Sequence, residues 1–312
     1  MKVLFVSSGN TAFGVSPITR NQGNSLEKNG INVFYFPIYG KGLLSYLKNV
    51  FALNKYLSNN KYDVVHAHYS LSAYVATLSG AKPLVVSLMG SDVKPSFASK
   101  LLIKFFSRFF WHHTIVKSAY MRNSLGLSNA SVFPNGVDTD VFYPMDKLTC
   151  AKQLGWDIKK KHILFAAKPS RPEKNFALAE QAVTQLDNAS IKLHTLIDVP
   201  HERIPLWLNA TDVVLLTSLW EGSPNVIKEA MACNRPIVAT DVGDISWLFG
   251  DEPGHYLTTF ADEDVAAKLR KALAFSERIG QTKGRMRIIE LGLDSAPVAK
   301  KIADVYQQVL YN

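Results

Sequence analysis

The stretch from Trp220 to Asp244, WEGSPNVIKEAMACNRPIVATDVGD, constrains the fold of this chain most strongly. Ser223 is a good N-cap, and Pro224 has the fixed φ of a first helical residue, so a helix is predicted to begin here. Asn234-Arg235-Pro236 ends the helix, and Ile237 to Thr240 has the composition of a buried strand. The stretch therefore predicts a strand, loop, helix and strand of an α/β domain.

Two carboxylates, Glu221 and Glu229, lie eight residues apart across the predicted loop and helix. Helical spacing places Glu229 at the border of the apolar arc, and Glu221 is expected in the loop over the carboxyl edge of the sheet. Open α/β sheets bind ligands at that edge, where helix N-termini attract anions and carboxylates accept hydrogen bonds from hydroxyl groups. A ligand with phosphates and hydroxyls suits this segment, although a capping-region Glu and a solvated Glu would have the same spacing.

The pattern E-G-x-P-x-x-x-x-E-A-M-A, with a hydrophobic strand before it and P-I-V-A-T-D-x-G after it, resembles the E-x7-E motif of family 4 glycosyltransferases. These are retaining enzymes with the two-domain GT-B fold. The resemblance implies that Glu221 contacts the donor sugar and that Glu229 binds the ribose of the nucleotide. The start of the helix adds further donor-binding candidates: Gly222, Ser223, Pro224, Asn225 and Val226.

With 312 residues the chain is long enough for two domains of about 150 residues each. The resemblance implies an α/β protein of the GT-B class, with two Rossmann-like domains whose parallel sheets face each other across a cleft. The segment P-N-G-V-D ending at Asp138 resembles the family's junction. We therefore predict an acceptor-binding domain at 1–144 and a donor-binding domain at 145–296, with the terminal helix, 297–312, packing back on the first domain.

Three cations, Lys168, Arg171 and Lys174, follow a predicted strand of the second domain. Guanidinium and ammonium groups at the carboxyl end of a strand suit a diphosphate, and the resemblance implies an Arg and a Lys on the donor diphosphate. Lys174 matches the P-E-K element, and we choose Arg171 over Lys168 for the other position, although all three would also fit as surface cations. The contact to the base is expected at Asp198-Val199, with Val199 as the candidate.

The first predicted strand leads into a loop rich in small and polar residues, SSGNTAFGVSPITRNQG. The loop lacks the G-x-G-x-x-G spacing of a dinucleotide site, which argues against a nicotinamide cofactor. In the family this loop lies near the donor diphosphate and the acceptor. Gly14 is the candidate for that contact.

Acceptor-binding candidates follow two further predicted strands. His66 and His68 lie on one face of the D-V-V-H-A-H strand, which borders the acceptor cleft in the family; a structural role for the pair is equally compatible with the pattern. Relatives have H-G-x-D where this chain has Met89-Gly90-Ser91-Asp92, and Asp92 is expected to bind an acceptor hydroxyl. The missing His is not essential for a retaining transfer by front-face attack, since the leaving phosphate can take the acceptor proton.

Positive charge is concentrated in the first half of the chain. Residues 1–146 contain 14 Lys or Arg and 6 Asp or Glu, against 21 and 20 in residues 147–312. Two predicted helices align cations beside apolar and aromatic residues, which favours the surface of an anionic membrane, although outer helices with solvated basic edges would show the same pattern. The cations are Lys41, Lys48 and Lys55 in the first helix and Lys100, Lys104 and Arg108 in the second.

The composition, 47% hydrophobic and 20% charged, is that of a soluble globular protein. The sequence shows neither a long apolar run nor a signal segment, so we expect a cytoplasmic protein, peripheral on the inner face of the cell membrane. Cys150 and Cys233 are expected to be free thiols.

Together these features predict a retaining glycosyltransferase of the hexosyltransferase type, which moves a sugar from a nucleotide-diphosphate sugar to a hydroxyl of a lipid-linked glycan acceptor in polysaccharide or cell-envelope biosynthesis. No metal and no further cofactor are expected. The alternatives are a non-catalytic protein of the same fold that binds nucleotide sugar or glycan, and an epimerase or phosphorolytic enzyme acting on the same donor. Nucleic acid is a more distant alternative partner, because no nucleic-acid motif accompanies the basic charge.

Overall fold

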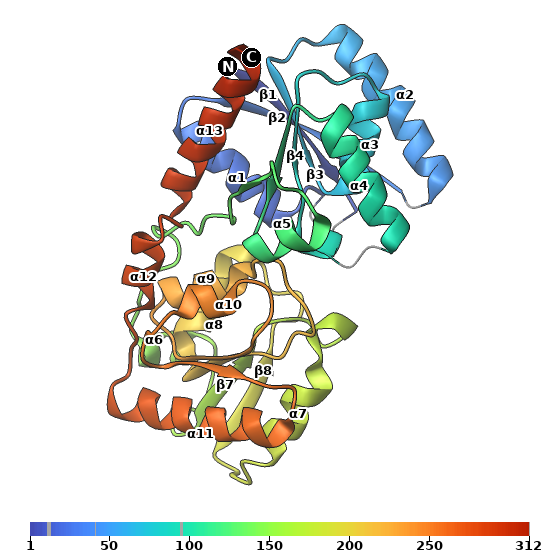
Figure 1. Cartoon of the computed structure of the whole chain (residues 1–312). Coiled ribbons are helices and arrows are strands. Elements are labelled where there is room, and N and C mark those ends of the chain that lie inside the picture. The colour runs from blue at the N-terminus through green and yellow to red at the C-terminus, as the bar shows by residue number, and fades with distance from the viewer. Residues whose placement is uncertain (11–13, 41, 94–95, 312) are drawn as a thin grey trace. The chain divides into compact units, whose positions relative to one another are not determined.

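The structure, a computed structural model, describes residues 1–10, 14–40, 42–93 and 96–311. The chain divides into two compact units (Figure 1): unit 1 comprises Met1–Gly136 and Ser295–Asn312, and unit 2 comprises Val137–Asp294. The division after Gly136 comes earlier than the predicted boundary near Tyr143-Pro144. The reason is that Val137 donates its N–H to the carbonyl of Leu293 at 2.9 Å and Phe142 is buried in the core of unit 2.

Unit 1 contains a parallel sheet of six strands in the order β2-β1-β3-β4-β5-β6. The pairing register places Val3 of β1 beside Val33 of β2 and Val64 of β3. β3 and β4 are buried along their whole length, as expected for central strands with helices over both faces. The strands are β1 (Lys2–Ser8), β2 (Asn32–Ile38), β3 (Val64–His68), β4 (Leu84–Ser87), β5 (His113–Val116) and β6 (Ser131–Val132).

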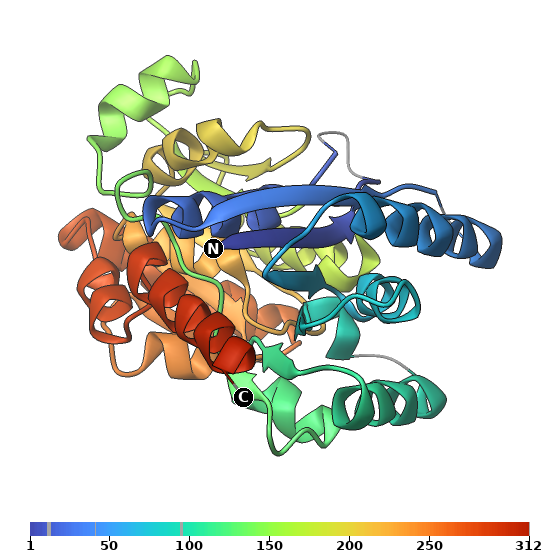
Figure 2. The same cartoon turned by 90° about the horizontal axis from the view of Figure 1, so that it is seen from above.

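Side chains of β1 alternate between two cores, one on each face of the sheet. Val3 and Phe5 pack with α1 (Pro17–Lys28) and α13 (Ser295–Tyr311), and Leu4 and Val6 pack on the opposite face. Figure 2 shows α13 on one side of these strands and α2 and α4 on the other. The helices of the second face are α2 (Leu43–Asn59), α3 (Ser70–Leu78), α4 (Phe97–Phe109) and α5 (Ala119–Leu125), and η1 (Gly90–Val93) follows β4.

The helix α13 belongs to unit 1 although it follows all of unit 2 in the sequence. Its Ile302 and Tyr306 side chains are buried in the same cluster as Val3 and Phe5, and the hydroxyl of Tyr306 lies 2.6 Å from Nδ1 of His66. The two parts of unit 1 therefore share one core.

Unit 2 contains a parallel sheet of five strands in the order β11-β10-β9-β7-β8. The two parallel sheets, each between layers of helices, confirm the predicted α/β fold of two Rossmann-like domains. The strands are β7 (Lys161–Phe165), β8 (Ile191–Thr195), β9 (Val213–Leu216), β10 (Ile237–Thr240) and β11 (His255–Thr258). The helices are α6 (Lys147–Gln153), η2 (Pro172–Lys174), α7 (Phe176–Thr184), η3 (His201–Arg203), α8 (Ile204–Ala210), α9 (Asn225–Ala232), α10 (Ile245–Phe249), α11 (Asp262–Arg278) and α12 (Gly284–Glu290).

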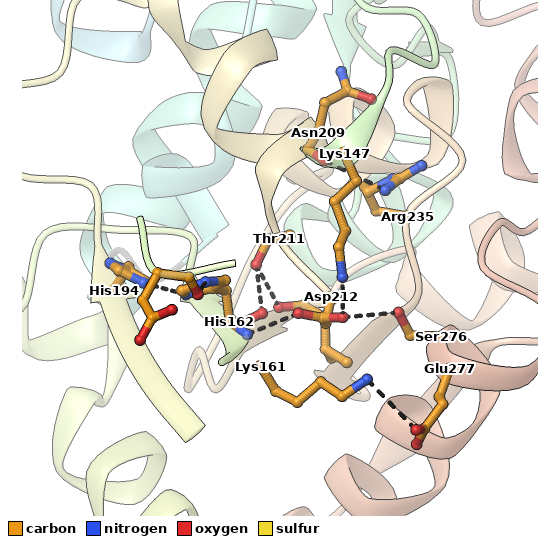
Figure 3. A network of polar contacts seen from close by, with 12 residues as sticks. Lys147, Lys161, His162, His194, Asn209, Thr211, Asp212, Arg235, Ser276 and Glu277 are labelled. Atoms are coloured by element: carbon orange, nitrogen blue, oxygen red, sulfur yellow. Dashed lines mark hydrogen bonds and ion pairs between the residues drawn. The ribbon is translucent and has the colours of Figure 1, made fainter. Parts of the chain in front are cut away.

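A polar network around Asp212 joins several elements at the amino ends of β7 and β9 (Figure 3). Its carboxylate pairs with Lys147 of α6 at 2.5 Å and accepts hydrogen bonds from the N–H of His162 at 2.8 Å and from Ser276 of α11 at 3.3 Å. Nε2 of His162 lies 3.0 Å from a carbonyl oxygen and must donate to it, so Nδ1 accepts from Nε2 of His194 at 2.9 Å. These side chains are occupied in holding the fold together, at the edge of the sheet away from the loops described next.

Candidate active site

The loops after β7 and β9 bring a lysine and a glutamate together at the carboxyl edge of the unit 2 sheet. Lys174 ends η2, and its ammonium group forms an ion pair with Oε1 of Glu221. The same oxygen accepts a 2.7 Å hydrogen bond from Ser218. The side chains of Lys174 and Glu221 are only 10% and 14% exposed, so each charge depends on the other for compensation.

Backbone contacts fix the position of this pair. Thr217 donates its hydroxyl hydrogen bond to the carbonyls of Lys174 and Asn175, at 3.0 and 2.9 Å. Thr240, the last residue of β10, donates to the carbonyl of Ser218 at 2.7 Å. These bonds tie the loops after β7 and β9 to each other and to the end of β10.

Gly243 allows the loop after β10 to approach the backbone of Glu221. Its φ is +68°, in the left-handed region that favours glycine, and a Cβ at this position would lie 2.9 Å from the carbonyl oxygens of Glu221 and Gly222. Any other residue would force these two loops apart.

The second glutamate of the motif, Glu229 in α9, lies 3.2 Å from Nε2 of His201 at the start of η3. This hydrogen bond raises the pKa of His201. Sequence reasoning did not single out His201, because nothing in the chain links it to a residue 28 positions later. The available signal was its place two residues after Val199, the candidate for the contact to the base.

The start of α9 differs from the prediction. The helix begins at Asn225, after Pro224 rather than with it, and no side chain caps its first turn. Ser223 lies one residue before the N-cap position, which is Pro224, and its hydroxyl accepts a 3.0 Å hydrogen bond from the ammonium of Lys228. Lys228, which sequence reasoning also missed, is fully buried, and burial lowers its pKa to about 8.

The remaining donor-site candidates of unit 2 lie around this edge. Lys168 pairs with Asp198 in the loop after β8, and Arg171 pairs with Glu173 at 2.5 Å. Both cations are about half exposed, so both remain accessible to an anion. The side chains of Val199 and Val226 pack against the same core cluster.

Comparison with known protein families covers both units. Residues 13–141 match Glycosyltransferase Family 4, and residues 157–274 match Glycosyl transferases group 1. The chain belongs to glycosyltransferase family 4. The resemblance inferred from the E-x7-E motif is thereby confirmed.

Curated relatives of this family 4 glycosyltransferase include TuaC of Bacillus subtilis (strain 168), a putative teichuronic acid biosynthesis glycosyltransferase, at 28% identity over 60% of this chain. The chain spans only 55% of the length of TuaC. A second relative is the UDP-Gal:alpha-D-GlcNAc-diphosphoundecaprenol alpha-1,3-galactosyltransferase of Escherichia coli, at 24% identity over 97% of this chain and 91% of that protein.

Solved structures share the fold over nearly the whole chain. Sucrose-phosphate synthase from Thermosynechococcus elongatus aligns with a TM-score of 0.82 at 17% identity, over 99% of both chains. HepE of Anabaena, in complex with UDP and glucose, aligns with a TM-score of 0.74 at 18% identity, over 99% of this chain and 100% of that one. At this level of identity the comparison shows the fold alone, which is the GT-B fold of glycosyltransferases.

The structure does not support the prediction that His66 and His68 of this glycosyltransferase contact the acceptor. Both side chains are fully buried, because β3 is a central strand covered on both faces. His66 lies between the hydroxyls of Tyr306 and Ser87, at 2.6 and 2.8 Å. Neither ring is exposed, and a contact of either with the acceptor stays a prediction.

Asp92 is likewise occupied within unit 1. Oδ1 accepts a 2.7 Å hydrogen bond from the Ser70 hydroxyl, and Oδ2 accepts one of the same length from the N–H of Met89. These bonds join the loop after β4 to the start of α3, and the contact to an acceptor hydroxyl stays a prediction. Gly14 has a left-handed φ of +72°, and a Cβ there would meet nothing within 4 Å.

The described part of this family 4 chain contains no three His, Cys, Asp or Glu side chains gathered so that they could hold a metal ion. Every helix within the described ranges is too short or too polar to span a membrane. Cys150 and Cys233 are buried free thiols.

Proposed function

We propose that the chain is a retaining hexosyltransferase that moves a sugar from a nucleotide-diphosphate sugar to a hydroxyl of a lipid-linked glycan, in polysaccharide or cell-envelope biosynthesis. The observation that carries the proposal is the Lys174–Glu221 pair at the carboxyl edge of the unit 2 sheet. The names of relatives support the substrate classes: one uses UDP-Gal and a diphosphoundecaprenol-linked sugar, and another acts in teichuronic acid biosynthesis.

In this proposal Lys174 binds the diphosphate and also holds Glu221, the residue that binds the sugar. Its ammonium has three N–H donors, and Glu221 uses one of them, which leaves two for phosphate oxygens. Glu221 accepts hydrogen bonds from sugar hydroxyls with its remaining lone pairs. Arg171 adds a second positive charge, so that the charge developing on the leaving diphosphate is neutralised in the transition state.

The nucleotide is held by the other end of the motif. Glu229 accepts hydrogen bonds from the ribose hydroxyls while His201 fixes its orientation. The N–H groups at the start of α9, an eight-residue helix, face the phosphates. In a front-face transfer the acceptor oxygen bonds to the anomeric carbon as the bond to the diphosphate breaks, and the acceptor proton passes to the leaving phosphate. This chemistry requires no metal.

A thermal-shift screen of UDP, GDP, ADP and their sugars tests the donor site, with EDTA present throughout. A ligand at 100 times its dissociation constant stabilises the fold by about 2.7 kcal/mol. One nucleotide should raise the melting temperature of the wild type and of Lys271→Ala, an exposed control in α11, but not of Lys174→Ala. If no nucleotide stabilises the wild type, the transferase proposal fails.

The stereochemistry has its own test. Slow hydrolysis of the donor releases free sugar, whose anomer is read by proton NMR before mutarotation. An α-linked donor should give the α-anomer first if the enzyme retains configuration. Initial release of the β-anomer would show inversion and contradict this part of the proposal.

We further propose that unit 1 makes a peripheral contact with the anionic inner face of the cell membrane, in the cytoplasm. Unit 1 contains 16 Lys or Arg and 4 Asp or Glu, whereas unit 2 contains 19 and 22. On α2, Leu44 and Phe51 are 77% and 75% exposed, and Lys48 and Lys55 lie on the same helix. Exposed apolar side chains beside cations are typical of an interfacial helix.

A further inference from the structure

Unit 1 contains a cavity of ≈ 590 Å³ beside α4. Its walls come from α4, from the segment leading into β5 and from the loop between α5 and β6. Because β5 begins at His113, the cavity lies at the amino end of that strand, away from the loops that follow the carboxyl ends. Its volume is within the range of about 300–1,000 Å³ of small-molecule sites.

The cavity is positively charged. Lys104 and Arg108 line it from positions one turn apart on α4, and none of its lining residues is acidic. No ion pair in the described part of the chain involves either cation. The ammonium of Lys104 reaches across to the end of α5, 3.8 Å from the position a Cβ would take at Gly126. Both charges are thus available to an anion.

His112 supplies a third hydrogen-bond donor to the cavity. Its Nδ1 accepts a 3.2 Å hydrogen bond from the N–H of Leu84, so the proton of the neutral imidazole is on Nε2. Burial and the nearby Lys82 lower the pKa of His112, which keeps the ring neutral at pH 7. The nitrogen that Leu84 does not use, Nε2, is therefore a hydrogen-bond donor and not an acceptor.

The helix α4 also lines the cavity with apolar side chains that are open to solvent. Leu101, Phe105 and Phe109 line it from α4 and are 53%, 50% and 68% exposed. The rings of Phe105 and Phe109 lie 5.1 Å apart, and Trp111 forms a buried part of the wall. An occupant that covers these rings while it meets the cations must carry both an anionic group and hydrocarbon.

We propose that this cavity binds one molecule of an anionic phospholipid, with its phosphate on Lys104, Arg108 and His112 and the start of its acyl chains on Phe105 and Phe109. A zwitterionic lipid would bring a cation of its own into a site that has no acidic residue to receive it. The proposal goes beyond sugar transfer and does not depend on the donor site. It also differs from a diffuse attraction of the basic surface, because it requires a defined cavity.

Short-chain lipids below their micelle concentration separate the cavity from the membrane surface, since they present single molecules and no bilayer. Dihexanoyl phosphatidylglycerol should raise the melting temperature of the full chain in a saturable way. Dihexanoyl phosphatidylcholine and inorganic phosphate at the same concentration should not. An equal shift with inorganic phosphate would reveal a free-anion site, and an equal shift with phosphatidylcholine would reveal a purely apolar one; either result overturns the proposal.

Two matched variants locate the binding. Lys104→Ala/Arg108→Ala should weaken the apparent affinity for dihexanoyl phosphatidylglycerol at least tenfold, and Lys48→Ala/Lys55→Ala on α2 should change it less than twofold. Equal weakening by both pairs would mean diffuse charge and would overturn the proposal.

A third variant fills the cavity without removing charge. Ser128→Trp, at an exposed position of the lining, should abolish binding of the short-chain lipid, and unchanged binding would place the lipid elsewhere and refute the proposal. Circular dichroism and a cooperative urea transition, both measured on the full chain, check that each variant is folded. If no nucleotide binds the wild type while the lipid does, the donor-site proposal fails and this one stands.

Discussion

The contact between His201 and Glu229, the second glutamate of the motif, makes the stability of the protein depend on pH. The pKa of His201 is raised by the hydrogen bond to Glu229, so the stabilisation from this contact is fully present below about pH 6.5 and is lost as the pH rises through the folded-state pKa. Glu229→Gln should therefore cost more stability relative to wild type at pH 6 than at pH 9, by up to about 1 kcal/mol. Urea unfolding at the two pH values measures this difference. An equal loss at both would show that the pair is not ionised.

The contact between His66 and Tyr306 makes a second prediction at this scale. Tyr306→Phe removes the hydroxyl that lies 2.6 Å from Nδ1 of His66 and leaves a buried polar atom without its partner. Such a loss costs about 1–3 kcal/mol. Urea unfolding should show it, while Tyr311→Phe, 85% exposed on the same helix, should stay within about 0.5 kcal/mol of wild type. Equal stability of the two variants would contradict a structural role for this bond.

The role of a residue could be predicted where the residue belongs to a family motif. It could not be predicted where the residue depends on a hydrogen-bond partner that is distant in the sequence. Glu221, Glu229 and Lys174 follow from spacing and resemblance, and the structure places Lys174 against Glu221. His201 and Lys228 become visible only when the loops are folded together. Period-two alternation predicts a shared face for His66 and His68, but it cannot show that both faces of the strand are covered.

At the scale of elements, the packing of one loop on another depends on Gly243. Gly243→Ala places a methyl group 2.9 Å from two carbonyl oxygens and so should displace the loop that carries Glu221, weakening nucleotide-sugar affinity at least tenfold. Gly30→Ala is the control, with the same left-handed φ but nothing within 4 Å, and should cost only about 1 kcal/mol of stability. Isothermal titration measures the nucleotide-sugar affinity of both variants, and urea unfolding measures their stability. Wild-type affinity in Gly243→Ala would mean that the loop contact does not position Glu221.

The sequence predicts the strands and helices themselves better than it predicts the residues at which they begin and end. The apolar runs predict β9 and β10 because buried parallel strands need continuous hydrophobic sequence. α9 begins one residue later than the capping pattern predicts, with Pro224 at the N-cap position and Ser223 bound to Lys228, a contact that local sequence does not reveal. The domain boundary was placed too late for a similar reason, since Val137 and Phe142 are held by residues of the unit 2 core.

For the whole molecule, the division of charge predicts a strong dependence on ionic strength. Unit 1 carries a net charge of +12 and unit 2 a net charge of −3. The screening length falls from about 10 Å at 0.1 M salt to about 3 Å at 1 M, so binding to vesicles of phosphatidylglycerol should fall at least tenfold over this range. Cosedimentation measures this binding, with vesicles of zwitterionic phosphatidylcholine as the control without net charge. Salt-independent binding would show that apolar contacts alone hold the chain to the membrane.

The chain crosses between its units twice, which gives the protein an order of assembly during synthesis. All of unit 2 leaves the ribosome before α13 does, so unit 2 can fold as a continuous segment while the face of the unit 1 sheet around Val3 and Phe5 still lacks its cover. Unit 1 closes only when residues near Tyr306 reach His66, 240 positions earlier. Unit 1 is therefore begun before unit 2 and completed after it, and until then one face of its sheet lacks part of its apolar cover.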